Sequence, residues 1–192
     1  HAVFVRTWEA MAIVFADKAS YTAHASKEVG DAIATIIGYY SQQTNRVTMY
    51  DLTGIEAQRQ AGDRRTTAAQ INQMLARPES ERTVATIVHE ATHQLAFNCG
   101  LATRCADIPL WVSEGVAMYF ESPDLQKPNG WSKIGSVNRY QLAAFRGFVG
   151  RREAGSLKTL LADDSRLQSS RTALDAYAES WALNYFLIQQ RP

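Results

Sequence analysis

Long apolar runs are missing from this sequence, and so is a strong excess of either charge. No apolar run approaches the length of a membrane span, so we expect no transmembrane helix in this segment. The net charge is only +1, which gives no indication of nucleic acid or an anionic membrane surface as a partner. Repeats and linker-like changes of composition are also missing. With 46% hydrophobic residues among 192, the chain is expected to form a single domain, in one core or two lobes.

Histidine is scarce, but two of the four histidines lie close together in the motif HEATH at residues 89–93. On an α-helix, side chains four residues apart lie on the same face, so the imidazoles of His89 and His93 can bind one metal ion together. Glu90 projects beside this pair, where its carboxylate can contact a water on the metal and act as a general base. The motif therefore supplies two metal ligands and a base.

The surroundings of the motif favour a helix with one buried face. Apolar residues recur there at helical spacing, namely Val84, Ile87, Val88, Ala91 and Leu95. Ser80 or Glu81 can begin this helix, and Asn98 with Gly100 can end it. The alternative, a helix with two polar residues beside an apolar stripe and no metal, is disfavoured because the motif residues lie off the stripe.

A catalytic zinc site needs a third protein ligand and leaves one position for water. The other histidines, His1 and His24, lie far upstream, and we interpret His24 as a surface or packing residue. The pattern HExxHxxGxxH is excluded, because Ala96 and Cys99 occupy the positions of its glycine and third histidine. The candidates downstream of the motif are Cys99, Asp107, Glu114 and Glu121.

Glu114 is the best of these candidates, because it lies in a second helix-like segment between Pro109 and Pro123. The apolar residues of this segment can pack it against the first helix. HEATH followed by WVSEGVAMYFE, with twenty residues between His93 and Glu114, resembles the gluzincins, zinc metallopeptidases whose third ligand is a glutamate on the helix after the HExxH helix. Within them, the sequence is most similar to an uncharacterised bacterial domain family with the patterns HEATHQL and PxWxxEGxAxYFE.

The resemblance implies His89, His93 and Glu114 as zinc ligands and Glu90 as the base. Some gluzincins carry an aspartate four residues after the ligand glutamate, where it orients a histidine, but that position is Met118 here. The carboxylate that usually supports a metal histidine is therefore not identified by the motif. Glu121, two turns after the ligand on the same face, is one candidate, and its alternative role is a solvated carboxylate at the helix end.

Tyr177 begins the segment YAESWAL, which resembles the segment of gluzincin aminopeptidases that starts with a catalytic tyrosine. The match implies that Tyr177 donates a hydrogen bond to the oxyanion formed during peptide hydrolysis. The alternatives are a tyrosine packed at a helix start, or the same role for Tyr119 or Tyr140. The GxMEN-type substrate motif of these aminopeptidases is absent, which disfavours aminopeptidase activity.

Cys99 and Cys105 bracket the connection between the two ligand-bearing helices. In an exported protein we expect a disulfide between them, and in the cytosol two thiols. The pair favours an extracytoplasmic or secreted location. The sequence starts with His1 and shows no basic-then-apolar signal segment, so we interpret it as a processed or excised form. Cys99 as a zinc ligand is disfavoured, because thiolates favour closed structural sites, and peptide deformylases place their cysteine before the motif.

The segments before the motif predict a small sheet. We expect a buried strand at 10–15, a helix-compatible segment at 17–29, and a hairpin of strands 36–40 and 46–50. In the zincin fold an edge strand lies along the cleft and pairs with extended substrate, so we expect the 46–50 strand or its neighbour to do this. The remaining expectations are a polar loop at 54–65, a helix at 66–76, a cleft-side loop at 124–135, and helices at 137–151, 156–161 and 172–190.

Together these observations predict an α+β protein with a zincin-like fold over residues 1–192. Residues 1–98 would form a lobe with a small mixed sheet and the HExxH helix, and 99–192 a helical lobe with the third ligand. We expect a metallopeptidase that uses Zn²⁺ and acts on peptide or protein substrates. The alternatives are a non-catalytic zinc-containing domain that binds peptide or cell-envelope material, and a zinc hydrolase of a non-peptide amide. The sequence gives no oligomeric state.

Overall fold

The computed structural model describes residues 11–30, 33, 36–51, 78–122 and 134–190. The predicted loop at 54–65, the predicted helix at 66–76 and most of the predicted loop at 124–135 lie outside these residues. Seven helices and one three-stranded mixed sheet form the described part of the chain. The protein is therefore α+β, as its sequence predicts. Among the described helices, none has the length and apolar character to cross a membrane.

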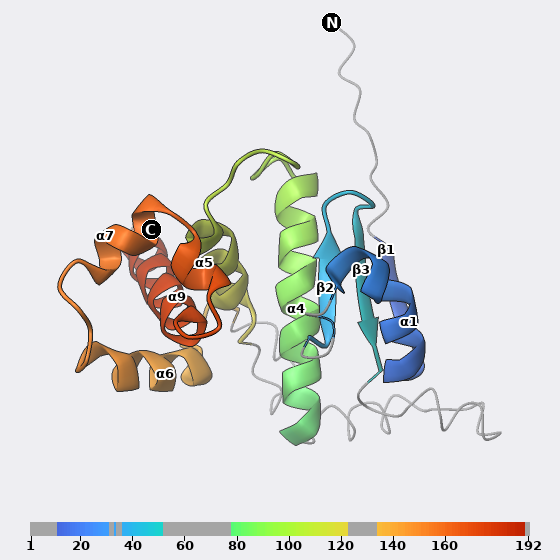
Figure 1. Ribbon diagram of the computed structural model, residues 1–192, viewed down its shortest axis with the longest axis horizontal. Coiled ribbons are helices and arrows are strands. Elements are labelled where there is room, and N and C mark those ends of the chain that lie inside the picture. Colours follow the sequence, from blue (N-terminus) through green and yellow to red (C-terminus); the bar gives the residue numbers. More distant parts are fainter. Residues whose placement is uncertain (1–10, 31–32, 34–35, 52–77, 123–133, 191–192) are drawn as a thin grey trace, which may run out of the picture.

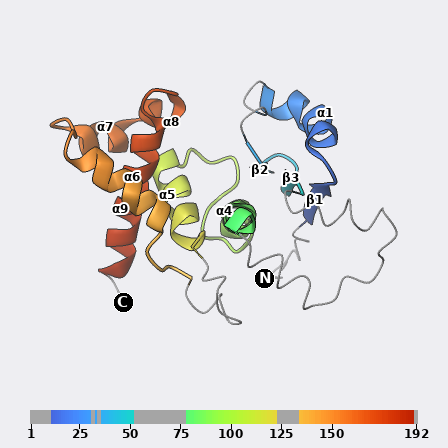
Figure 2. The ribbon, with the colours of Figure 1, turned by 90° about the horizontal axis from the view of Figure 1, so that it is seen from below.

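Helix α4 (Pro78–Asn98) stands between two groups of elements. The sheet and α1 (Lys18–Val29) lie on one side of it, and the C-terminal helices lie on the other (Figures 1 and 2). α4 carries the HEATH motif, so the motif lies at the boundary between the two groups.

The sheet has the order β1-β3-β2, in which β1 (Met11–Phe15) is parallel and β2 (Gly38–Ser41) antiparallel to β3 (Arg46–Tyr50). The predicted hairpin is thus confirmed. The expectation that 46–50 could be an edge strand is wrong, because β1 pairs with the side of β3 that the hairpin leaves free. Its neighbour β2 is an edge strand of this sheet. β1 is also an edge strand and is not buried as predicted, since Met11 and Val14 are 45% and 59% exposed.

Helix α1 covers the sheet with a small aromatic core. Asp17 caps the helix by accepting a hydrogen bond from the Ser20 amide at 2.8 Å. Tyr21 on the buried face is fully enclosed, and its ring lies 5.2 Å from that of Tyr50 and 6.5 Å from that of Tyr39. The helix is thereby fixed to both β2 and β3.

Helix α4 is attached to the sheet by aromatic and amide contacts. Phe97 stacks on Tyr40 of β2 with ring centroids 5.7 Å apart. The buried side chain of Gln94 donates hydrogen bonds to the carbonyls of Asn45 at 2.8 Å and Met11 at 3.1 Å. Of the predicted apolar stripe, Val84 and Val88 are buried, whereas Ile87 and Leu95 are exposed. The predicted stripe is therefore only partly buried.

The C-terminal helices are α5 (Leu110–Phe120), α6 (Arg139–Val149), α7 (Ser156–Ala162), α8 (Ser165–Gln168) and α9 (Ala173–Gln189). They match the predicted helices closely, with α8 in addition. α9 is central to the group, because α5, α6, α7 and α8 all pack against it. Its buried Glu179 accepts hydrogen bonds from Ser156 and Arg166, both at 2.7 Å, and forms an ion pair with Arg152. These contacts hold α7 and α8 to α9.

Candidate metal centre

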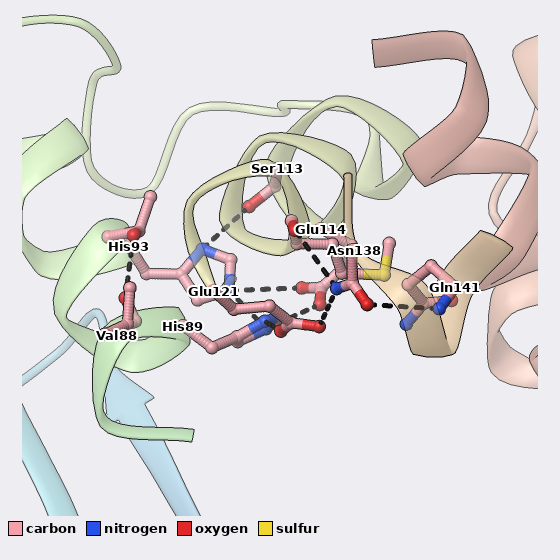
Figure 3. Close-up of polar contacts among 10 residues, drawn as sticks. Val88, His89, His93, Ser113, Glu114, Glu121, Asn138 and Gln141 are labelled. Atoms are coloured by element: carbon pink, nitrogen blue, oxygen red, sulfur yellow. Dashed lines mark hydrogen bonds and ion pairs between the residues drawn. The ribbon is translucent and has the colours of Figure 1, made fainter. Parts of the chain in front are cut away.

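Three side chains from α4 and α5 converge on one point (Figure 3). The Nε2 atoms of His89 and His93 are 3.2 Å apart. The Glu114 carboxylate lies with Oε2 at 3.1 Å from His89 Nε2 and Oε1 at 3.4 Å from His93 Nε2. One ligand atom from each residue falls within 4.8 Å of the others, so the group could hold a metal ion.

The chemistry of the three groups fits a divalent transition metal. Two imidazole nitrogens and one carboxylate oxygen are the protein ligands of a class of catalytic zinc sites. Their side chains are only 12% to 16% exposed. The two imidazole nitrogens and the carboxylate are turned toward one another where little water reaches them. Their lone pairs and negative charge would repel one another without a cation or a proton between them.

Helix α5 is placed for this contact by its first turn and by α9. Pro109 precedes the helix, and the Leu110 amide donates to Oδ1 of Asp164 at 2.9 Å. On its far side, Gly115 lies directly against Asn184, whose Nδ2 donates to the Trp111 carbonyl at 2.9 Å. Glu114 therefore faces α4 while its neighbour Gly115 packs on α9.

The outer nitrogens of both histidines also have partners. Glu121 places Oε2 at 2.9 Å from His89 Nδ1, and Ser113 places Oγ at 3.2 Å from His93 Nδ1. Asn138, before α6, donates from Nδ2 to Oε1 of Glu121 at 2.7 Å. The sequence indicates Glu121 as one candidate for this position. It does not indicate Ser113, although this residue precedes the ligand glutamate, nor Asn138, which no motif marks.

The ionisable groups influence one another strongly in the metal-free protein. Burial lowers the pKa of His93 below its usual value. Burial would also lower the pKa of His89, but its hydrogen bonds with Glu114 and Glu121 raise that pKa well above the usual value. For Glu114, burial acts to raise the pKa, and the contact with His89 outweighs it and lowers the pKa. Glu114 is thus ionised, as a metal ligand must be.

Glu90 differs from the three converging side chains. Burial raises its pKa to about 7, with the Glu114 carboxylate adding to the rise and His89 opposing it. The backbone of Tyr40 on β2 also acts on Glu90 and lowers its pKa. Glu90 is therefore near both the converging side chains and the edge strand, and a carboxyl group with a pKa near 7 suits proton transfer at neutral pH.

Tyr177, at the second turn of α9, lies near the same cluster. Burial raises the pKa of its hydroxyl, and the Glu114 and Glu90 carboxylates raise it further. The other two tyrosines considered from the sequence are placed elsewhere. Tyr140 is 71% exposed, and the hydroxyl of Tyr119 accepts a hydrogen bond from Gln189 at 3.2 Å.

The remaining candidates lie away from the centre. Asp107 is exposed, and His24 is exposed with its ring 5.0 Å from Phe15, as expected of a surface or packing histidine. Cys99 and Cys105 are exposed free thiols, so the predicted disulfide is not formed. Cys99 Sγ turns back to the Ala96 carbonyl, and Cys105 is held with positive φ by a bond from its amide to Gln42. The cysteines thus give no support for an extracytoplasmic location.

A family comparison covers the part of the chain that contains this centre. The family described as "Protein of unknown function (DUF1570)" matches residues 83–192. The chain belongs to this family. The DUF1570 match begins six residues before the HEATH motif and includes all the residues of the candidate metal centre and Tyr177, whereas the sheet precedes it. No curated protein and no solved structure matches the chain.

Proposed function

We propose that the protein is a zinc-dependent metallopeptidase of the gluzincin type. The observation that carries this proposal is the convergence of His89, His93 and Glu114, with Glu90 beside them and outside the ligand set. A site that only binds metal has no need of Glu90, whereas hydrolysis requires a base at this position. The HExxH spacing and the later glutamate agree with the gluzincin pattern seen in the sequence.

The roles of the side chains follow from their positions. Zinc bound by His89, His93 and Glu114 would supply a water of lowered pKa and would polarise the substrate carbonyl. Glu90 takes the proton of the attacking water and then gives it to the amine that leaves when the C–N bond breaks. In the metal-free protein, burial raises the pKa of Glu90 to about 7, so its carboxyl group exchanges a proton more readily near neutral pH than an exposed glutamate does.

Tyr177 is assigned the role of hydrogen-bond donor to the oxyanion. Its raised pKa keeps the phenol protonated at neutral pH, so that it can donate. Removing one such donor typically lowers kcat by 10²- to 10³-fold. We expect Tyr177→Phe to lower kcat by about 10²-fold and to leave zinc content unchanged. Tyr140→Phe, at a hydroxyl exposed to solvent, is the matched control and should behave as the wild type.

The edge strand β2 is the proposed platform for an extended peptide. The Ile37 carbonyl, just before β2, accepts a hydrogen bond from the Tyr50 amide of β3. Bonding alternates along an antiparallel pair, so Gly38 and Tyr40 direct their backbone groups away from β3. The backbone of Tyr40 also acts on the pKa of the proposed base Glu90, which supports a position of this edge near the reacting groups. A peptide that pairs with β2 should lose cleavage when alternate backbone amides are N-methylated, whereas methylation at the intervening positions should be tolerated.

The decisive experiment compares zinc content and peptide cleavage in the wild type, Glu90→Gln and Glu114→Ala. We expect about one zinc per chain in the wild type, the same content in Glu90→Gln and a sharp fall in Glu114→Ala. Cleavage of a mixed peptide library, followed by mass spectrometry, should fall by 10²-fold or more in Glu90→Gln. Glu153→Gln, at an exposed glutamate between α6 and α7, is the control.

Two results would contradict the proposal in different ways. A Glu90→Gln variant with full activity would remove the assigned base. A wild type that binds zinc but cleaves no peptide in the library would favour a zinc-containing binding domain or the hydrolysis of a non-peptide amide.

A further inference from the structure

We propose that Glu121 and Asn138 form a brace that fixes the ring orientation and the tautomer of the proposed ligand His89. The inference rests on the proposed zinc site, and it concerns two residues that are not ligands. In some gluzincins an aspartate four residues after the ligand glutamate has this positioning role. This chain has Met118 at that position, so the role is assigned to Glu121 and Asn138 instead.

The brace consists of three side chains from three separate parts of the chain. His89 lies on α4, Glu121 directly follows α5, and Asn138 directly precedes α6. Glu121 joins them, with Oε2 at 2.9 Å from His89 Nδ1 and Oε1 at 2.7 Å from Asn138 Nδ2. Figure 3 shows these side chains together with Glu114, which contacts the other nitrogen of the His89 ring.

One backbone amide fixes the orientation of the Asn138 side chain in the brace. Asn138 is the N-cap residue of α6, and its Oδ1 accepts from the Gln141 amide at 3.1 Å. Because a backbone N–H can only donate, this contact fixes which end of the Asn138 side chain is oxygen. The Nδ2 end must then face Glu121, and it also donates to the Met118 carbonyl at 3.3 Å.

The Glu121 carboxylate joins Asn138 to His89. It accepts through Oε1 from Asn138, and its other oxygen faces Nδ1 of His89. A carboxylate oxygen accepts, so this contact assigns a proton to Nδ1. In the zinc-bound protein that we propose, Nε2 would then be the unprotonated nitrogen, on the side where Glu114 and His93 converge, which is the form in which a histidine binds a metal ion.

Burial makes the brace more than a surface contact. Asn138 is 5% exposed, and the side chains of His89 and Glu121 are each 16% exposed. A donor left without its acceptor here would have little access to water. The corresponding partner of His93 is only a hydroxyl, that of Ser113, at 3.2 Å. We therefore expect the loss of Glu121 to weaken zinc binding more than the loss of Ser113.

Two variants separate the brace from ordinary helix capping. His89 and Asn138 face different oxygens of Glu121, so in Glu121→Gln the NH₂ group must face one of the two donors and that hydrogen bond is lost. Asn138→Asp keeps an N-cap acceptor for α6 but removes the donor to Glu121 and sets two carboxylates against each other. The control is Glu153→Gln, which changes an exposed glutamate in the same way.

The experiment measures the zinc affinity of each metal-free protein by competition with a chromophoric chelator. Removing such a partner of a metal histidine typically lowers affinity by 10- to 100-fold. We expect a loss of about this size in Glu121→Gln, about tenfold in Asn138→Asp, and none in Glu153→Gln. In the zinc-loaded wild type, long-range ¹H–¹⁵N correlation should show the proton of His89 on Nδ1.

The outcomes distinguish this inference from the proposed function. If Glu121→Gln and Asn138→Asp bind zinc within twofold of the wild type while His93→Ala does not bind it, the brace is overturned and the zinc site stands. The brace is also overturned if both variants lose thermal stability without losing zinc affinity. If the wild type binds no zinc, the zinc site and the brace are both overturned.

Discussion

Gly115 of α5 lies against the side chain of Asn184 on α9, so closely that a Cβ at residue 115 would overlap the Asn184 amide and lie 2.8 Å from the Ser180 carbonyl. This contact sets the distance between the two helices. We expect Gly115→Ala to lower the free energy of unfolding by about 1 to 3 kcal/mol, because one helix must shift. Glu114 would move with α5, so zinc affinity should fall as well.

Gly147 of α6 is the matched control for this substitution, because a Cβ there meets nothing within 4 Å. Gly147→Ala should be neutral or raise stability by roughly 0.5 to 1 kcal/mol, since alanine favours the helix. Urea denaturation of both variants measures the two effects. Equal effects of the two variants would show that the contact with Asn184 does not limit the packing of α5.

The raised pKa of Glu90 predicts how the stability of the metal-free protein depends on pH. Burial raises the pKa from the usual 4.5 to about 7, so between these pH values the folded protein holds a proton that the unfolded chain has released. The stability that this proton contributes is complete below pH 4.5 and is lost as the pH rises through about 7. The loss is on the order of 3 kcal/mol.

The matched comparison is with Glu90→Gln, in which the nearby histidines and Glu114 still titrate. Urea denaturation of the two metal-free proteins should be measured from about pH 4.5 to about pH 8. As the pH rises, the free energy of unfolding of the wild type should fall by about 3 kcal/mol relative to that of the variant. Parallel pH profiles would show that Glu90 ionises in the folded protein as easily as in the unfolded chain.

Zinc should stabilise the folded protein in a saturable way. A ligand that binds only the folded state at a free concentration about 100 times its Kd adds about 2.7 kcal/mol to the free energy of unfolding. Thermal unfolding with and without zinc, and after addition of a chelator, measures this effect. His93→Ala should show little of it, and an equal shift in that variant would place the bound zinc elsewhere.

Tyr21 offers a test of the aromatic core under α1. Its hydroxyl is buried and has no hydrogen-bond partner among the described residues, whereas the Tyr39 hydroxyl donates to Glu28 at 2.9 Å. We expect Tyr21→Phe to raise the free energy of unfolding by about 1 kcal/mol, because an unpaired buried polar group is removed. Tyr39→Phe, which loses a bonded hydroxyl, should be neutral or slightly destabilising. Chemical denaturation that shows a loss of stability in Tyr21→Phe would indicate a partner for its hydroxyl.

The sequence predicted most of the fold because its local signals are strong. The HEATH helix, α5 and the 38–50 hairpin follow from short-range periodicity and turn residues, which act within the segment itself. The pairing of β1 with β3 depends on a contact between segments far apart in sequence, such as Met11 with Arg46. No local pattern encodes such a contact, so β3 could not be recognised as the central strand.

The candidate site also combines residues that local sequence brings together with residues that only the packing of helices brings together. His89 and His93 are one helical turn apart, so their juxtaposition is a property of the helix alone. The sequence ranked Glu114 first among the candidates because it lies in a second helix-like segment, and the family resemblance then implied it as a ligand, but its approach to the histidines depends on how α5 packs on α4. Asn138 could not be predicted, since its two roles as a helix cap and as a donor to Glu121 arise only when α5 and α6 are both in place.

Glu114 is the only charged residue of the eleven in α5, whose remaining side chains are almost all apolar or aromatic. In the unfolded chain this segment combines β-branched and aromatic residues with a single charge, a composition that promotes intermolecular β-aggregation. The proposed zinc ligand is thus also the residue that keeps unfolded chains apart at this point. Glu114→Ala should aggregate more readily during refolding from denaturant, whether or not zinc is present.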